Sequence, residues 1–146
     1  PGLAVGAALA LKGSGRLVVA ALGDGDTLMG ITALWTAAKY RLPVLFLIGN
    51  NRSYFNDELH QESVAEARGR NPENAWVGQR LDHPAPDFAQ LARAQGVAAS
   101  GPVKTQEELD AAIAEAVATL RDGWPSLIDA WIDPRQGRET AAQRAS

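Results

Sequence analysis

The sequence predicts an α/β fold with a mainly parallel sheet flanked by helices. Apolar runs of strand length recur along the 146-residue chain, which is typical of strands buried on both faces. Segments with the apolar periodicity of helices separate these runs. Alternation of buried strands and helices is the pattern of a parallel sheet covered by helices.

The first half of the chain predicts two helices and two strands. Residues 2–11 are small and apolar, as in a closely packed helix, and residues 17–22 (LVVAAL) form a continuous apolar run. Residues 27–40 place their large apolar side chains on one helical face. Pro43 opens a second apolar run over 44–48, a position at which strands tolerate proline.

The middle of the chain differs from the rest in composition. Residues 50–86 are polar and charged, and this stretch is long for a loop. We therefore expect it to be functional or to contain a short helix, over 58–68. Residues 87–95 predict a further helix, which Gly96 terminates.

The last part of the chain predicts a strand, a helix and a strand. Residues 97–99 indicate a short strand. Residues 105–108 (TQEE) fit a capping box and open a helix with one apolar stripe. Residues 126–132 (SLIDAWI) predict the last strand, and the polar tail over 134–146 is expected to fray.

Composition limits the possible partners and compartments. Hydrophobic residues make up 46% of the chain, enough for the core of one ordinary domain. The net charge of -3 gives no electrostatic basis for a nucleic-acid or membrane partner, and the lack of cysteine excludes disulfides. No apolar run approaches the roughly 18 residues that span a bilayer, and no signal peptide is visible, so we expect a cytoplasmic protein.

The chain opens on a predicted helix with no strand before it, and its first residue is Pro1. A complete unit of this class usually starts with a strand. We therefore expect one domain over residues 1–133 that is truncated at its N terminus and belongs to a larger protein.

Two polar motifs follow the first two predicted strands. Gly23-Asp24-Gly25 ends the first apolar run and Gly49-Asn50-Asn51 ends the second, with 24 residues (26–49) between Gly25 and Asn50. That interval holds one helix and one strand, which return the chain to the same edge of a parallel sheet. Ligands of open α/β sheets bind at this edge, and neighbouring strands lie roughly 5 Å apart.

An acid in a glycine loop indicates a cation. Asp24 would repel a bare phosphate, whereas a divalent cation between them reverses the sign of the interaction. Mg²⁺ takes about six oxygen ligands at roughly 2.1 Å and often joins one or two carboxylates to substrate phosphates. Asp24 offers a carboxylate and Asn51 an amide oxygen, while the helix expected near Thr27 points its amide end at a diphosphate.

Other phosphate motifs fit the residues less well. Leu28 breaks the G-x-G-x-x-G pattern, and the chain has no G-K-[ST] sequence. The alternative is that both glycine motifs are ordinary strand-ending turns.

The Gly-Asp-Gly motif, 24 residues and the Asn-Asn pair are similar to the signature of thiamine diphosphate-dependent enzymes. The chain resembles the group that contains acetolactate synthase, benzoylformate decarboxylase and pyruvate decarboxylase, over about residues 2–133. The resemblance implies the diphosphate-binding (PP) domain, usually the C-terminal domain of a three-domain polypeptide, with thiamine diphosphate and Mg²⁺ as cofactors.

The resemblance also implies the residues of the site. Asp24, Asn51 and the backbone carbonyl of Ser53 correspond to the Mg²⁺ ligands. Asp26 stands where many members have Ser, so we expect neighbouring amides to bind the diphosphate. The implied cofactor-binding residues are Gly23, Asp24, Gly25, Asp26, Thr27, Asn51, Ser53 and Tyr54, and the implied substrate contacts are Phe55, Asn56 and Asp57.

The family activates its cofactor with a Glu on a different domain, usually of a partner subunit. We therefore expect no catalytic residue in this chain, weak cofactor binding and no turnover by the isolated chain, and a homo-oligomer. The implied function is decarboxylation or carboligation of a 2-keto acid. The alternatives are a thiamine diphosphate-dependent C–C hydrolase or lyase acting on a diketone, and a non-catalytic module that binds a metal and a phosphate.

The remaining polar residues favour structural explanations. His60 and His83 have no partner at a recognisable spacing, so solvated or loop-packing side chains are expected. The arginines of the polar segment are expected at a solvated surface, with contact to missing domains or an anionic substrate as the alternative. These arginines are Arg52, Arg68, Arg70 and Arg80.

Overall fold

The computed structural model describes residues 1–133, which fall into two compact units. The first unit contains Pro1–Asn50 and Asp87–Trp131, and the second contains Asn51–Pro86 and, among the described residues, 132–133. The polar tail expected over 134–146 lies outside the described residues.

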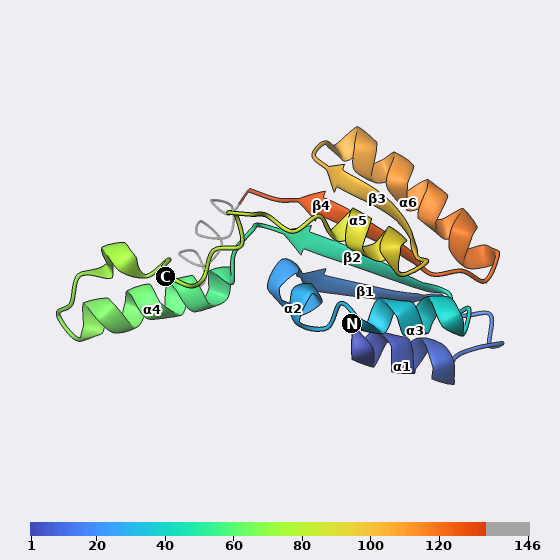
Figure 1. Cartoon of the computed structure of the whole chain (residues 1–146), viewed down its shortest axis with the longest axis horizontal. Coiled ribbons are helices and arrows are strands. Elements are labelled where there is room, and N and C mark those ends of the chain that lie inside the picture. Colours follow the sequence, from blue (N-terminus) through green and yellow to red (C-terminus); the bar gives the residue numbers. More distant parts are fainter. Residues whose placement is uncertain (134–146) are drawn as a thin grey trace. The chain divides into compact units, whose positions relative to one another are not determined.

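The first unit is built on a four-stranded sheet. Its strands are β1 (Val18–Gly23), β2 (Val44–Asn50), β3 (Ala98–Val103) and β4 (Ser126–Trp131). They lie in the order β1-β2-β4-β3, and each neighbouring pair is parallel (Figure 1). The predicted fold class, a mainly parallel sheet flanked by helices, is confirmed.

Helices cover both faces of this sheet. On one face α1 (Gly2–Ala10), α3 (Ala33–Lys39) and α5 (Phe88–Ala94) pack against the strands, and α6 (Gln106–Arg121) covers the other face. The larger core cluster centres on Leu34, Phe46, Phe88 and Leu127, and the smaller one on Leu45, Leu120 and Ile128. Within residues 1–133 no helix combines the length and apolar character that a membrane crossing requires.

The single helix expected over 27–40 is wrong. The chain forms α2 (Asp24–Met29), breaks at Gly30 and then forms α3. A side chain at position 30 would bring its Cβ to 2.8 Å from Pro1 Cδ, so this close approach requires glycine. Because α2 starts three residues earlier than expected, Asp24 lies in its first turn.

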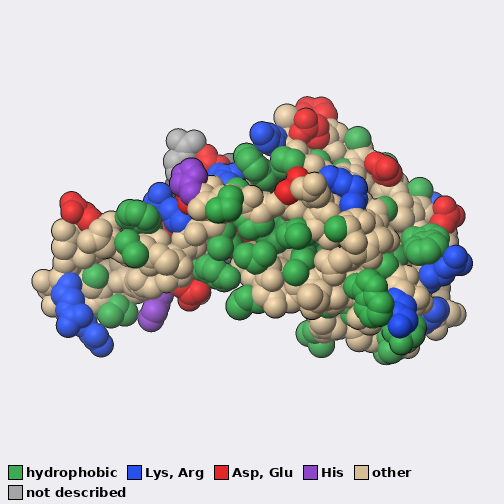
Figure 2. All heavy atoms as spheres, in the orientation of Figure 1, with side chains coloured by type: hydrophobic (Ala, Val, Ile, Leu, Met, Phe, Trp, Pro, Cys, Tyr) green, Lys and Arg blue, Asp and Glu red, His purple; other side chains and the backbone are tan. Residues whose placement is uncertain are grey.

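The outer strand β1 leaves apolar surface uncovered. Its side chains alternate between partly buried and exposed, and Val19 is 61% exposed. Leu3 of α1, Met29 of α2 and Trp35 of α3 are also exposed, and Figure 2 shows apolar side chains at the surface where α1 and α3 lie. Apolar patches of this kind are typical of surfaces that contact another protein part.

The second unit contains α4 (Phe55–Ala67) and the short 3₁₀ helix η1 (Pro72–Asn74), which contact each other. The helix expected over 58–68 is confirmed but starts at Phe55. It ends where Gly69 adopts φ +63°, and the Arg70 amide donates to the Ala65 carbonyl at 2.8 Å. This is the geometry in which a glycine terminates a helix.

Candidate functional site

The two glycine motifs begin at neighbouring strand ends. In the register of β1 and β2, Gly23 pairs with Gly49 as the last pair of the two strands. Asp24 and Asn50 directly follow these paired glycines, at the carboxyl edge where such sheets bind ligands. The predicted parallel pairing of the two motif-bearing strands is therefore confirmed.

The loop at residues 23–27 is fixed by its own hydrogen bonds. Asp24 is only 3% exposed, and its Oδ1 accepts from the Gly25 amide at 2.9 Å. The Thr27 hydroxyl donates to the Gly23 carbonyl at 2.7 Å, so this side chain secures the turn. In α2 the first amides have no acceptor within the helix, which makes them the backbone donors of this loop.

A buried pair of polar side chains supports the end of β2. Asn50 Nδ2 donates to Asp129 Oδ1 of β4 at 2.9 Å, and Asp129 is 1% exposed. Burial raises the pKa of Asp129, the hydrogen bonds from Asn50 and Trp131 lower it, and the carboxylates of Asp87 and Asp24 raise it. Together these effects raise the pKa of Asp129 above the ordinary value for aspartate.

Asp129 was not predicted from the sequence to be part of the site, although its position in the sequence is unusual. An acid inside the apolar run SLIDAWI is unusual for a strand buried on both faces. Gly101 of β3 lies against it: a Cβ at position 101 would be 2.7 Å from Asp129 Cβ. The close packing of β3 on β4 at this point thus requires glycine at position 101.

The second unit brings two predicted metal ligands into one tight turn. Asn51 Oδ1 accepts from the Ser53 amide at 2.9 Å, the pattern of an Asx turn. Between them Arg52 adopts φ +62°, a left-handed conformation that is costly for a residue with a side chain. The Asn51 amide oxygen and the backbone of Ser53 therefore lie together.

A neighbouring segment holds this turn from outside. Ser53 and Arg80 form an antiparallel bridge, the Tyr54 amide donates to the Gln79 carbonyl at 2.8 Å, and the Leu81 amide donates to the Arg52 carbonyl at 2.8 Å. These bonds tie residues 52–54 to residues 79–81. This pairing was not predicted, because a single bridge between two segments has no periodic pattern in the sequence.

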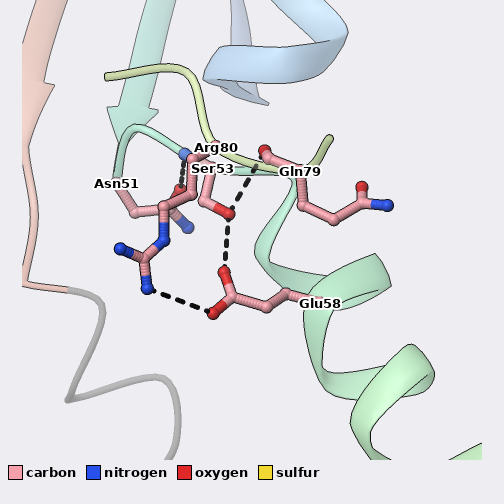
Figure 3. A network of polar contacts seen from close by, with 5 residues as sticks. All are labelled: Asn51, Ser53, Glu58, Gln79 and Arg80. Carbon is pink, nitrogen blue, oxygen red and sulfur yellow. Dashed lines mark hydrogen bonds and ion pairs between the residues drawn. The ribbon is translucent and has the colours of Figure 1, made fainter. Parts of the chain in front are cut away.

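Glu58 completes the network drawn in Figure 3. It is 6% exposed, and its Oε2 accepts from Ser53 Oγ at 3.0 Å. Its Oε1 lies 3.8 Å from Arg80 Nη2, and the Arg80 guanidinium stacks over Trp76. Arg80 was expected at a solvated surface; it is half-exposed but belongs to this network.

The predicted substrate contacts lie at the start of α4. Tyr54 is the N-cap residue, and its carbonyl accepts from the amides of Asp57 and Glu58 at 3.0 Å. Phe55 is partly buried, whereas Asn56 and Asp57 are exposed. Their role toward a substrate remains a prediction.

The predicted metal ligands form an all-oxygen donor set. No cluster of three or more His, Cys, Asp or Glu side chains suited to a metal occurs in the described part of the chain. Asp24, Asn51 and Ser53 instead combine one carboxylate, one amide oxygen and one carbonyl, a combination that suits Mg²⁺. Asp24 belongs to the first unit and the other two to the second, so their convergence on one ion remains a prediction.

His60 lies in a groove beside α4. It lines a shallow groove of about 310 Å³ along α4, together with Gln61, Val64, Ala65, Arg68 and Arg70. His60, Arg68 and Arg70 are exposed, in agreement with the expected solvated side chains.

Comparisons with known proteins agree with the motifs. Residues 1–130 match the family model of the thiamine pyrophosphate enzymes, C-terminal TPP-binding domain. The chain is 40% identical over 131 residues to benzoylformate decarboxylase of Pseudomonas aeruginosa, covering 86% of this chain and 21% of that protein. It is 30% identical over 116 residues to the acetolactate synthase isozyme 3 large subunit of Escherichia coli, covering 80% of this chain and 19% of that protein.

Solved structures give the same relationship. The thiamine diphosphate-dependent 4-hydroxybenzoylformate decarboxylase of Rhodococcus jostii superposes with a TM-score of 0.70 at 34% identity, over 89% of this chain and 21% of that one. This chain thus spans about a fifth of the length of the relatives that it matches. The chain belongs to the family of C-terminal, thiamine pyrophosphate-binding domains of thiamine pyrophosphate enzymes.

Proposed function

We propose that this chain binds the diphosphate of thiamine diphosphate through Mg²⁺, as part of a 2-keto acid decarboxylase or carboligase. Asp24, the Asn51 amide oxygen and the Ser53 carbonyl hold the metal ion. The observation that carries the proposal is the terminal pairing of Gly23 with Gly49, from which both ligand-bearing segments start at one edge of the sheet.

The loop at residues 23–27 holds the diphosphate in this proposal. Gly23 and Gly25 permit close approach, the early amides of α2, including that of Asp26, supply donors, and Thr27 secures the turn through Gly23. Mg²⁺ offsets the repulsion between Asp24 and the phosphate oxygens. Tyr54 follows the metal-binding turn directly and borders the cofactor.

When bound, thiamine diphosphate supplies a nucleophilic carbon and an electron sink for breaking the bond next to a keto group. This chain's residues anchor and orient the diphosphate, and we place the Glu that activates the cofactor in a pyrimidine-binding domain of another segment or of a partner subunit. A homo-oligomer supplies such a partner, and the exposed apolar surface around β1 suits the contact.

An aryl 2-keto acid is the first substrate to test, because relatives among the curated proteins and solved structures are benzoylformate decarboxylases. Phe55, Asn56 and Asp57 are the proposed contacts to it. They lie at the start of α4, next to the metal-binding turn along the chain.

Isothermal titration of the intact protein tests the proposal. We expect thiamine diphosphate to bind only with Mg²⁺ present, and nucleoside diphosphates to compete poorly. Equal binding of thiamine diphosphate with and without divalent cations would contradict it. The chain alone should bind the cofactor weakly and should not decarboxylate benzoylformate.

A further inference from the structure

The turn at residues 51–53 needs external support. Its middle residue, Arg52, is in the left-handed region, which disfavours the conformation in an isolated peptide. The Asx bond from the Ser53 amide to Asn51 Oδ1 is local and can be exchanged for water. Contacts from elsewhere in the second unit must therefore maintain the turn.

Glu58 provides such a contact from α4. Its carboxylate is almost fully buried, which is unfavourable unless hydrogen bonds and a countercharge compensate. Ser53 Oγ donates to Oε2 at 3.0 Å, while Arg80 faces Oε1 at 3.8 Å (Figure 3). The compensation therefore comes from the turn and from the segment that pairs with it.

Helix capping does not account for this arrangement. A carboxylate in the first turn of a helix ordinarily accepts from a backbone amide at the N-terminus. Glu58 accepts from the side chain of Ser53, which precedes the N-cap residue Tyr54. Ser53 Oγ also lies 3.4 Å from the Gln79 carbonyl, so the hydroxyl joins the turn to both neighbouring segments.

We propose that Glu58 is a positioning residue that holds residues 51–53 in the conformation that binds the metal ion. It acts through Ser53 Oγ, and Arg80 Nη2 faces the other carboxylate oxygen at 3.8 Å. The inference rests on the proposed function, because the oxygens it positions are those of Asn51 and Ser53. Groups that orient metal ligands by hydrogen bonds commonly change metal affinity by 10–100-fold.

Mg²⁺ titrations of the intact protein at saturating thiamine diphosphate test this role. Glu58→Ala should raise the half-saturating Mg²⁺ concentration about 10-fold or more. Its affinity for thiamine diphosphate at saturating Mg²⁺ should stay unchanged, because excess metal restores the turn. Glu58→Gln should give a smaller rise, since its amide oxygen still accepts from Ser53 Oγ.

Two further variants complete the design. Ser53→Ala keeps the carbonyl ligand but removes the hydroxyl, so it should match Glu58→Ala, and the double variant should add little. Glu66→Ala removes an exposed carboxylate from the same helix and should leave the Mg²⁺ curve unchanged. If Glu58→Ala does not fold, Ser53→Ala decides the question.

The outcomes separate this inference from the proposed function. If the unmodified protein binds thiamine diphosphate without any divalent cation, the proposed function fails and the inference fails with it. If the unmodified protein needs Mg²⁺ but the Ser53 and Glu58 variants have the same half-saturating Mg²⁺ concentration as the unmodified protein, only the inference fails. An equal loss of metal and cofactor affinity at all Mg²⁺ concentrations would indicate a purely structural role and would also overturn it.

Discussion

The two units of the molecule bury a carboxylate in different ways. In the sheet unit Asp129 accepts a hydrogen bond from Asn50, while the nearby charged groups are the carboxylates of Asp24 and Asp87. In the second unit Glu58 accepts from Ser53 and faces the guanidinium of Arg80. Burial and the nearby carboxylates therefore raise the pKa of Asp129, whereas the charged neighbour of Glu58 is a cation.

The units also differ in the oxygens that they offer to the proposed ion site. The sheet unit supplies the charged oxygen of Asp24, at a strand end fixed by the core. The second unit supplies neutral oxygens from Asn51 and Ser53, on a turn that polar contacts maintain. The proposed ion site thus takes its charged oxygen from a strand end and its neutral oxygens from a turn that hydrogen bonds maintain.

The largest expected effect comes from removing the charged ligand. Asp24→Ala should weaken Mg²⁺-dependent binding of thiamine diphosphate by roughly 100-fold or more, because the phosphate then lacks its metal bridge. Asn51→Ala removes only a neutral oxygen and should cost less. Titration of both variants against Asp110→Ala, an exposed acid on α6, measures the ranking. Equal losses of affinity in Asp24→Ala and Asn51→Ala would contradict the proposal that the charged oxygen matters more than the neutral one.

Packing around Asp129 should make the sheet unit intolerant of small changes. Gly101→Ala places a Cβ against the Asp129 backbone at a φ of +140°, and should destabilise the chain by about 3 kcal/mol. Gly69→Ala in the second unit meets open space and should cost only about 1 kcal/mol for its left-handed backbone. Urea unfolding of both variants measures the difference, and a similar cost at the two positions would contradict it.

The pH dependence of stability should distinguish the two carboxylates. The pKa of Asp129 is raised on folding, so the native state binds more protons than the unfolded state above the unfolded pKa. Its contribution to stability therefore falls as pH rises through the window between the unfolded and folded pKa values, and stays lost at neutral pH. Asp129→Asn keeps an acceptor for Asn50 and should gain stability over the unmodified chain as pH rises.

Glu58→Gln should behave in the opposite way at neutral pH. It removes the charge that Arg80 faces and should lower stability by about 1 kcal/mol, a modest value because Arg80 is 48% exposed. Urea unfolding of Asp129→Asn and Glu58→Gln from pH 4 to pH 8 measures how the free energy of unfolding of each variant differs from that of the unmodified chain. A loss of stability in Asp129→Asn at pH 7 would show that its charge is favoured after all.

The sequence was informative where apolar burial decides structure. The strands β1, β2 and β4 and the capped helix α6 were predicted within about two residues, because their apolar runs and the Thr105–Glu108 box are local signals. The break at Gly30 was missed because the packing of Pro1 against it is not a local signal. Asp24 and Asn51 were singled out by their place after apolar strands, and their role as metal ligands stays a prediction.

The supporting residues of the site were beyond the reach of sequence patterns. Glu58 and Arg80 meet through a bridge between residues distant in sequence, and each looks like an ordinary surface charge on its own. Asp129 could have been singled out as an acid in an apolar run, but its partner Asn50 follows only from the pairing of β2 with β4. Polar networks depend on tertiary contacts that periodicity does not encode.

The smallest expected effects come from removing helix caps, and they should show whether the two units unfold independently. Thr105 caps α6 by accepting from the Glu108 amide, and Asn71 caps η1 by accepting from the Glu73 amide at 2.9 Å. Thr105→Ala should lower the stability of the sheet unit as a whole by about 1 kcal/mol, because α6 covers one face of its core. Asn71→Ala should affect only the opening of the second unit, to which η1 belongs.

Amide hydrogen exchange measures this last difference. With Thr105→Ala, the slowest amides of β2 and β4 should exchange several-fold faster, since their protection follows global unfolding. With Asn71→Ala those amides should be unaffected, while the Tyr54 and Leu81 amides that hold the turn at residues 51–53 should lose protection. Faster exchange in β2 after Asn71→Ala would mean that the two units unfold together, and the turn would then share the stability of the sheet.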